Sequence, residues 1–93
     1  MSDTGMQTEP RSGSIALGGY PWLARMIDKA RLDALNALEP LDLEYPCPMD
    51  QRLLNQLKID ATTFQSIVMA SENDRQILEG LVKQGVQGIA LPD

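Results

Sequence analysis

The sequence predicts a small all-α protein, in which one long N-terminal helix packs with three shorter helices as an orthogonal bundle. Apolar residues recur at helical spacing in four segments, and prolines, glycines and capping residues stand near the ends of these segments. No alternating β-branched run is long enough to predict a strand. With 93 residues, the chain can form one domain around one compact core.

The predicted domain spans residues 15–85, between two tails. Residues 1–14 are polar, rich in small side chains and without apolar periodicity, and this composition predicts a flexible tail. Residues 86–93 form a C-terminal tail whose apolar side chains can dock on the core, although Gly88 and Pro92 argue against a helix there.

The longest predicted helix runs from Pro21 to about Leu38. Pro21 suits the first helical position, where its missing N–H costs nothing. Pro40 then ends the helix, because the residue before a proline avoids the α conformation. At about 100° per residue, the apolar residues fall on one stripe. The stripe consists of Leu23, Met26, Ile27, Ala30, Ala34 and Leu38.

Three shorter helices are predicted after a stiff, proline-containing segment at residues 45–48. They cover about residues 49–58, residues 61–70 with Asp60 as N-cap, and a last segment that ends at Gly85. Ser71 and Asp74 resemble a capping box at the start of this last helix. The predicted inward residues are Leu53, Leu54, Leu57, Phe64, Ile67, Val68, Ile77, Leu78, Leu81 and Val82.

Net charge excludes one class of partner. The chain carries a formal charge of −5, so the phosphate attraction that dominates nucleic-acid binding is missing. A helix-turn-helix around Ile59–Asp60 would have a recognition segment, residues 61–66, without Lys or Arg. The longest apolar run, Ile67–Ala70, is far too short to cross a bilayer, and residues 1–14 do not resemble a signal peptide. We therefore expect a cytoplasmic protein with no nucleic-acid or membrane partner.

The lack of histidine and the single cysteine, Cys47, restrict the chemistry further. They exclude an intramolecular disulfide, a His/Cys zinc cage and any catalytic triad that uses imidazole. Cys47 precedes a predicted helix N-terminus, where a thiolate is favoured, but no histidine is present to act as its base. We expect no catalytic residue, no metal and no cofactor.

Two motifs resemble a known family. The first is Leu17-Gly18-Gly19-Tyr20 followed by Arg25, Ile27-Asp28-Lys29 and Arg31, and the second is Tyr45-Pro46-Cys47-Pro48-Met49-Asp50. Together they resemble short bacterial proteins known only as a domain of unknown function, over about residues 11–81. The resemblance implies a bacterial, cytoplasmic, helical domain, and it implies no activity.

Gly18 and Gly19 lead toward the long helix and allow two interpretations. They form either a plain turn that sets where the helix starts or, with Gly13, an anion site at the helix N-terminus. The spacing matches neither the Walker pattern nor the dinucleotide fingerprint, which favours the turn.

A charge cluster on the long helix is the candidate polar site. Asp28 can reach Arg25 and Arg31, and Lys29 lies beside it. An inward Asp50 needs a cation, and an ion pair with Arg25 or Arg31 would lock two helices together. Alternatively, the arginines face outward and hold a carboxylate or phosphate. The candidate ligand-binding residues are Arg25, Asp28, Arg31, Asp50, Tyr20, Tyr45 and Cys47.

Leu32 and Leu35 form a second apolar strip beside the main stripe. Either the loop at residues 41–43 or a second protomer covers this strip. Trp22 either packs against the N-terminal segment or forms part of a partner surface. Trp22, Leu32 and Leu35 are therefore the candidate interface residues. Our leading hypothesis is a protein-interaction or structural module that forms a homodimer or binds another protein. The alternative is a binder of a small anionic ligand, or a minor enzyme, that uses the charge cluster.

Overall fold

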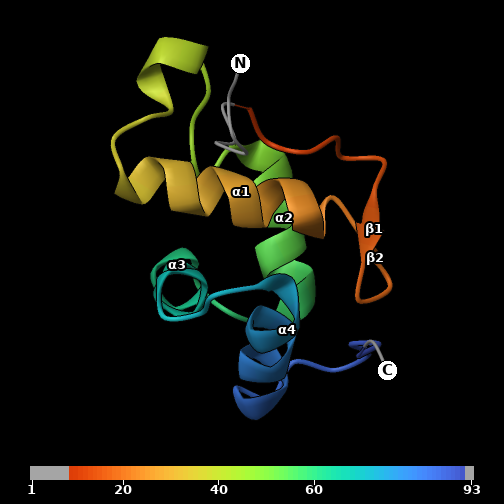
Figure 1. Cartoon of the computed structure of the whole chain (residues 1–93). Helices are drawn as coiled ribbons and strands as arrows, with labels where there is room; N and C mark the ends of the chain where they lie inside the picture. Colours follow the sequence, from red (N-terminus) through yellow and green to blue (C-terminus); the bar gives the residue numbers. More distant parts are fainter. Residues whose placement is uncertain (1–8, 92–93) are drawn as a thin grey trace, which may run out of the picture.

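The computed structural model describes residues 9–91 and is mostly helical (Figure 1). Its four helices are α1 (Leu23–Ala34), α2 (Pro48–Leu57), α3 (Ala61–Met69) and α4 (Asp74–Lys83). Two short strands, β1 (Ala16–Leu17) and β2 (Tyr20–Pro21), precede α1, and a 3-10 helix, η1 (Glu39–Leu41), lies in the loop after it. Residues 1–8 of the predicted flexible tail, and residues 92–93, lie outside the described residues.

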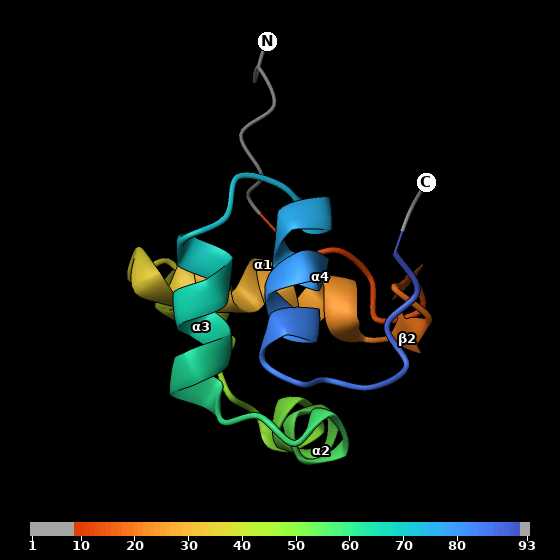
Figure 2. The same cartoon turned by 90° about the horizontal axis from the view of Figure 1, so that it is seen from below.

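Helix α1 packs against α3, and α3 also packs against α4. Figure 1 shows α1 lengthwise and α3 nearly end-on, so these two helices run in different directions. In Figure 2, the stretch after α4 turns back to lie beside the two strands. The N–H of Ala90 donates to the carbonyl of Gly18 at 2.8 Å, and the buried Val86 belongs to the core.

The core gathers apolar side chains from all four helices, which confirms most of the predicted inward residues. Ala34 and Val82 are wrong, because both are exposed. A helix turns by about 100° per residue, and this rotation carries Val82 to the edge of the stripe. Ala34 is the last residue of α1. The buried residues on the helices are Leu23, Met26, Ile27, Ala30, Leu53, Leu54, Leu57, Phe64, Val68, Ile77, Leu78 and Leu81.

The predicted long helix is shorter at both ends. At its start, Pro21 lies in β2 and Trp22 takes a left-handed conformation with φ of 76°, so the helix begins only at Leu23. At its end, Asn36 is left-handed with φ of 58°, and the N–H of Ala37 donates to the carbonyl of Leu32 at 2.8 Å. Asn tolerates this conformation better than most residues, so it ends the helix before Pro40.

A β-hairpin forms where no strand was predicted. β1 and β2 pair antiparallel, with Leu17 opposite Tyr20, so Gly18 and Gly19 are the two turn residues. Their φ values of 62° and 90° are the positive angles that a two-residue hairpin turn needs, and glycine adopts them without strain. The glycines therefore form a turn, as the simpler interpretation held, but that turn closes a hairpin.

The helix caps agree with the sequence at two of three positions. The side chain of Asp60 accepts from the N–H of Thr63 at 2.7 Å, and Gly85 with φ of 99° follows the end of α4. The predicted capping box at Ser71 is wrong, because Asn73 caps α4 by accepting from the N–H of Gln76 at 2.9 Å. The Ser71 hydroxyl instead donates to the carbonyl of Ile67, in the last turn of α3.

Candidate functional site

α1 carries two buried charges at neighbouring positions, Asp28 and Lys29, each 2% exposed. Successive helical residues point about 100° apart, so the two side chains reach different parts of the molecule. Buried charges are stable in proteins only when they are paired and hydrogen-bonded. Each of these two charges is therefore the centre of a separate polar network.

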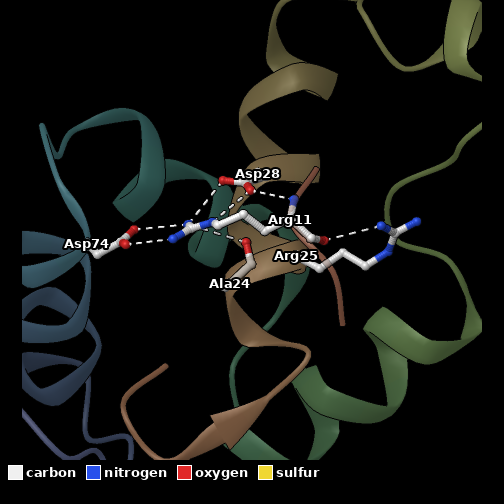
Figure 3. A network of polar contacts seen from close by, with 5 residues as sticks. All are labelled: Arg11, Ala24, Arg25, Asp28 and Asp74. Atoms are coloured by element: carbon white, nitrogen blue, oxygen red, sulfur yellow. Dashed lines mark hydrogen bonds and ion pairs between the residues drawn. The ribbon is translucent and has the colours of Figure 1, made fainter. Parts of the chain in front are cut away.

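The first network joins α1 to α4 through Arg11. The Arg11 guanidinium donates to Asp28 through Nε at 2.9 Å and Nη2 at 3.1 Å, and to Asp74 through Nη1 at 2.8 Å and Nη2 at 3.1 Å. Its backbone N–H also donates to Asp28 at 2.8 Å. Figure 3 shows the guanidinium lying between the two carboxylates. This fork geometry suits arginine and a pair of carboxylates.

Proton affinities in this network follow from the same contacts. Hydrogen bonds from the guanidinium to Asp74 and Asp28 raise the pKa of Arg11 above its ordinary value. The hydrogen bonds from Arg11 lower the pKa of Asp74, and the charge of Arg31 acts in the same direction. Both groups therefore stay charged near neutral pH.

The second network joins α1 to α2 through Asp50, whose side chain is fully buried. One carboxylate oxygen accepts from the Trp22 indole N–H at 2.7 Å. The other accepts from Lys29 Nζ at 2.7 Å and from the N–H of Cys47, the residue that precedes α2, at 3.0 Å. Both oxygens are thus satisfied, and Asp50 holds the start of α2 as the third residue of a capping box does.

Asp50 was expected to pair with Arg25 or Arg31, and this partner is wrong: the cation is Lys29. Arg25 instead donates to the carbonyl of Arg11 at 3.2 Å and lies 5.3 Å from the centre of the Trp22 ring. Asp28 pairs with Arg11, which precedes the hairpin and lies 17 positions away in the sequence. Lys29 is buried, whereas Arg25 and Arg31 are only partly buried, so the lysine is the cation that shares the interior with Asp50.

The candidate ligand-binding residues do not form one cluster. Asp50 and Cys47 meet at Lys29, whose Nζ lies 3.1 Å from Cys47 Sγ. Tyr20 donates to the carbonyl of Gln87 at 2.9 Å, next to the C-terminal stretch. Tyr45 donates to the carbonyl of Ala61 at 2.8 Å, at the start of α3. Burial, followed by the charge of Asp50, raises the pKa of Tyr45 above its ordinary value.

Sequence reasoning missed Arg11 and Asp74, and it left Lys29 out of the candidate site. Arg11 lies within the predicted tail, and its partner Asp74 is 63 positions away, so no helical spacing could connect them. The apolar stripe gave no signal for Lys29, because at about 100° per residue this side chain lies outside the arc that Met26 and Ala30 belong to.

A groove of about 460 Å³ runs between the hairpin and α2. Tyr20, Pro21 and Trp22 form one wall. Met49, Arg52, Leu53 and Gln56, spaced along one face of α2, line the opposite side. Met49 is 45% exposed, whereas Leu53 is buried.

The Trp22 indole is held in place from several sides. Its N–H is bound by Asp50, and a Cβ added at Gly13 would clash with ring atom Cε3, so the Gly13 backbone lies directly against the ring. The backbone N–H of Trp22 also donates to the carbonyl of Gly13 at 3.0 Å. The aromatic wall of the groove is therefore preorganised, which reduces the entropy lost on binding.

The other candidate interface residues lie away from this groove. Leu35 is 63% exposed and Leu32 is half-buried, and a homodimer through them stays a prediction. A second cavity, of about 370 Å³, lies beyond the end of α1. Its acidic lining residues are Asp33, Glu39, Asp42 and Glu44. Residues 9–91 bring no three His, Cys, Asp or Glu side chains together as metal ligands.

Residues 7–88 match the family described as a domain of unknown function (DUF5069), and the chain therefore belongs to this family. The match confirms the predicted membership of a family without an assigned activity. No curated protein matches the sequence. In the part of the chain that the structure describes, no helix is long and apolar enough to cross a membrane.

We predict that Lys29→Met and Asp50→Asn each lower the free energy of unfolding by about 3–5 kcal/mol, because each leaves a buried charge without its partner. The double variant should lose less than the sum of the two. Chemical denaturation measures all three values. Arg75→Gln, which removes the exposed Arg75–Glu79 pair, is the control and should leave stability nearly unchanged. An unchanged unfolding free energy in Asp50→Asn would contradict the locking role of this pair.

We also predict a loss of stability in acid that depends on Asp74. Its pKa is lower in the folded than in the unfolded chain. The stabilisation is therefore present above the unfolded value of about 3.9 and is lost as pH falls through the folded pKa. In Arg11→Gln, an NMR titration of the Asp74 carboxyl should give a higher pKa, closer to its ordinary value. The same pKa in both proteins would show that Arg11 does not hold this carboxylate in solution.

Proposed function

We propose that this member of the DUF5069 family is a protein-interaction module that binds a partner in the groove between the hairpin and α2. The observation that carries the proposal is the position of Trp22 in the groove. The buried carboxylate of Asp50 holds its indole, and the facing residues of α2 line the open side of the groove. Tryptophan is enriched among residues that dominate binding energy, and methionine adapts to varied partners.

The lining of the groove supports a protein partner better than a small polar ligand. Most of its surface comes from apolar and aromatic side chains, including the exposed Met49. In contrast, the carboxylates of the predicted cluster already hold internal cations: Asp28 is paired with Arg11, and Asp50 with Lys29. A small anion would have to compete with these internal carboxylates. The anionic-ligand hypothesis therefore ranks second.

Recognition in the groove relies on side chains rather than on strand addition. β2 is only two residues long, and one of them, Pro21, has no N–H to donate. The residues of α2 that line the groove recur at the spacing of one helical face, which suits an apolar side chain or a helix laid against it.

The free thiol of Cys47 supports a location in the reducing cytoplasm.

We predict that Met49→Gln weakens peptide binding without unfolding the protein. The test is selection from a display library of random peptides on the full chain, followed by measurement of dissociation constants. Burying a methionine side chain against a bound peptide contributes about 1.5–3 kcal/mol to binding. Without this contact, the affinity for the peptide should fall by about tenfold or more. Glutamine keeps the length and neutrality of the side chain.

Met69→Gln is the matched control, because Met69 on α3 is 46% exposed, compared with 45% for Met49, and lies outside the groove. Its affinity for the selected peptides should equal that of the wild type. The proposed function would be wrong if no selected peptide were sensitive to Met49→Gln, or if both variants weakened binding equally while both remained folded.

A further inference from the structure

We infer that the groove selects an acidic partner, namely a peptide segment that places an Asp or Glu beside its apolar anchor residue. This inference rests on the proposed function and names the chemistry of the partner. Among the described residues that line the groove, Arg52 alone is charged, and none is acidic.

Arg52 is available to a partner. It lies on the exposed side of α2, and no carboxylate within residues 9–91 forms an ion pair with it. A guanidinium presents a planar set of donors that matches a carboxylate and binds it through two hydrogen bonds. With Met49 and Leu53 on the same helical face, Arg52 sets a carboxylate next to an apolar side chain of the partner.

A second cation stands close to the opposite wall. The guanidinium carbon of Arg25 lies 5.3 Å from the centre of the Trp22 ring. Lys29 is also near this ring, at 6.0 Å, but its charge is balanced by Asp50. Arg25 has no such ion pair in the described part of the chain; its Nη1 donates to a backbone carbonyl. Arg25 lines a neighbouring cavity rather than the groove itself, so Arg52 is the cation that faces a partner in the groove.

The cavity beyond α1 has the opposite charge to the groove, since it is lined by four acidic side chains and no basic one. An acidic segment is therefore repelled from that cavity and attracted to Arg52. A basic segment is instead attracted to the acidic cavity and repelled from Arg52. Complementary charge steers association and excludes wrong partners more than it adds affinity.

The test measures, by fluorescence of Trp22 or by calorimetry, the binding of the selected peptides that are sensitive to Met49→Gln. We expect these peptides to be enriched in Asp and Glu next to an apolar residue. Their affinity for Arg52→Glu should fall by about tenfold or more, because like charges then face each other. Their affinity should also fall as salt concentration rises.

Arg75→Glu is the control, because it changes the net charge by the same amount on α4, outside the groove. It should weaken binding far less than Arg52→Glu. If groove-dependent peptides lack acidic residues, or bind Arg52→Glu as tightly as wild type, the acidic partner is wrong while the interaction module stands. If no peptide depends on Met49, both proposals fail.

Discussion

The buried ion pair between Lys29 and Asp50 is the interaction on which the rest of the structure depends. Removing two charges from water is costly, and the cost is offset only when every remaining polar atom of the pair finds a partner. Asp50 meets this condition by accepting from Lys29 on α1, from the Cys47 N–H before α2 and from the Trp22 indole. One carboxylate thereby sets the position of α2 against α1 and the orientation of the aromatic wall of the groove. The packing of α2 on α1 and the shape of the proposed binding groove therefore both depend on Asp50.

The helical content could be predicted from the sequence because its signals are local. The apolar stripes of α2 and α3, the Asp60 cap and the Gly85 stop each depend on residues a few positions apart. The start of α1 was not predictable in this way, since Pro21 fits both a first helical position and a strand residue. Gly18 and Gly19 carried a hairpin signal, but strands of two residues are too short to show alternation.

The candidate site was predicted only in part, because it depends on contacts between distant segments. Asp50 was expected to be an inward carboxylate with a cationic partner on the preceding helix, and it is, although the cation is Lys29. Arg11 could not be found, since its two carboxylates come from α1 and α4 and only the folded chain brings them together (Figure 3). The groove has the same origin, because the hairpin forms one wall and α2 the other.

Hydrogen exchange at the Trp22 indole N–H, followed by NMR, tests the central role of Asp50 most directly. Trp22 is the only tryptophan, so its indole gives a single resonance. A hydrogen bond of 2.7 Å to a fully buried carboxylate predicts strong protection, with exchange only through an opening of the structure. In folded Asp50→Ala protein, the protection should be lost. Rapid exchange in the wild type, at the rate of a free indole, would contradict the account.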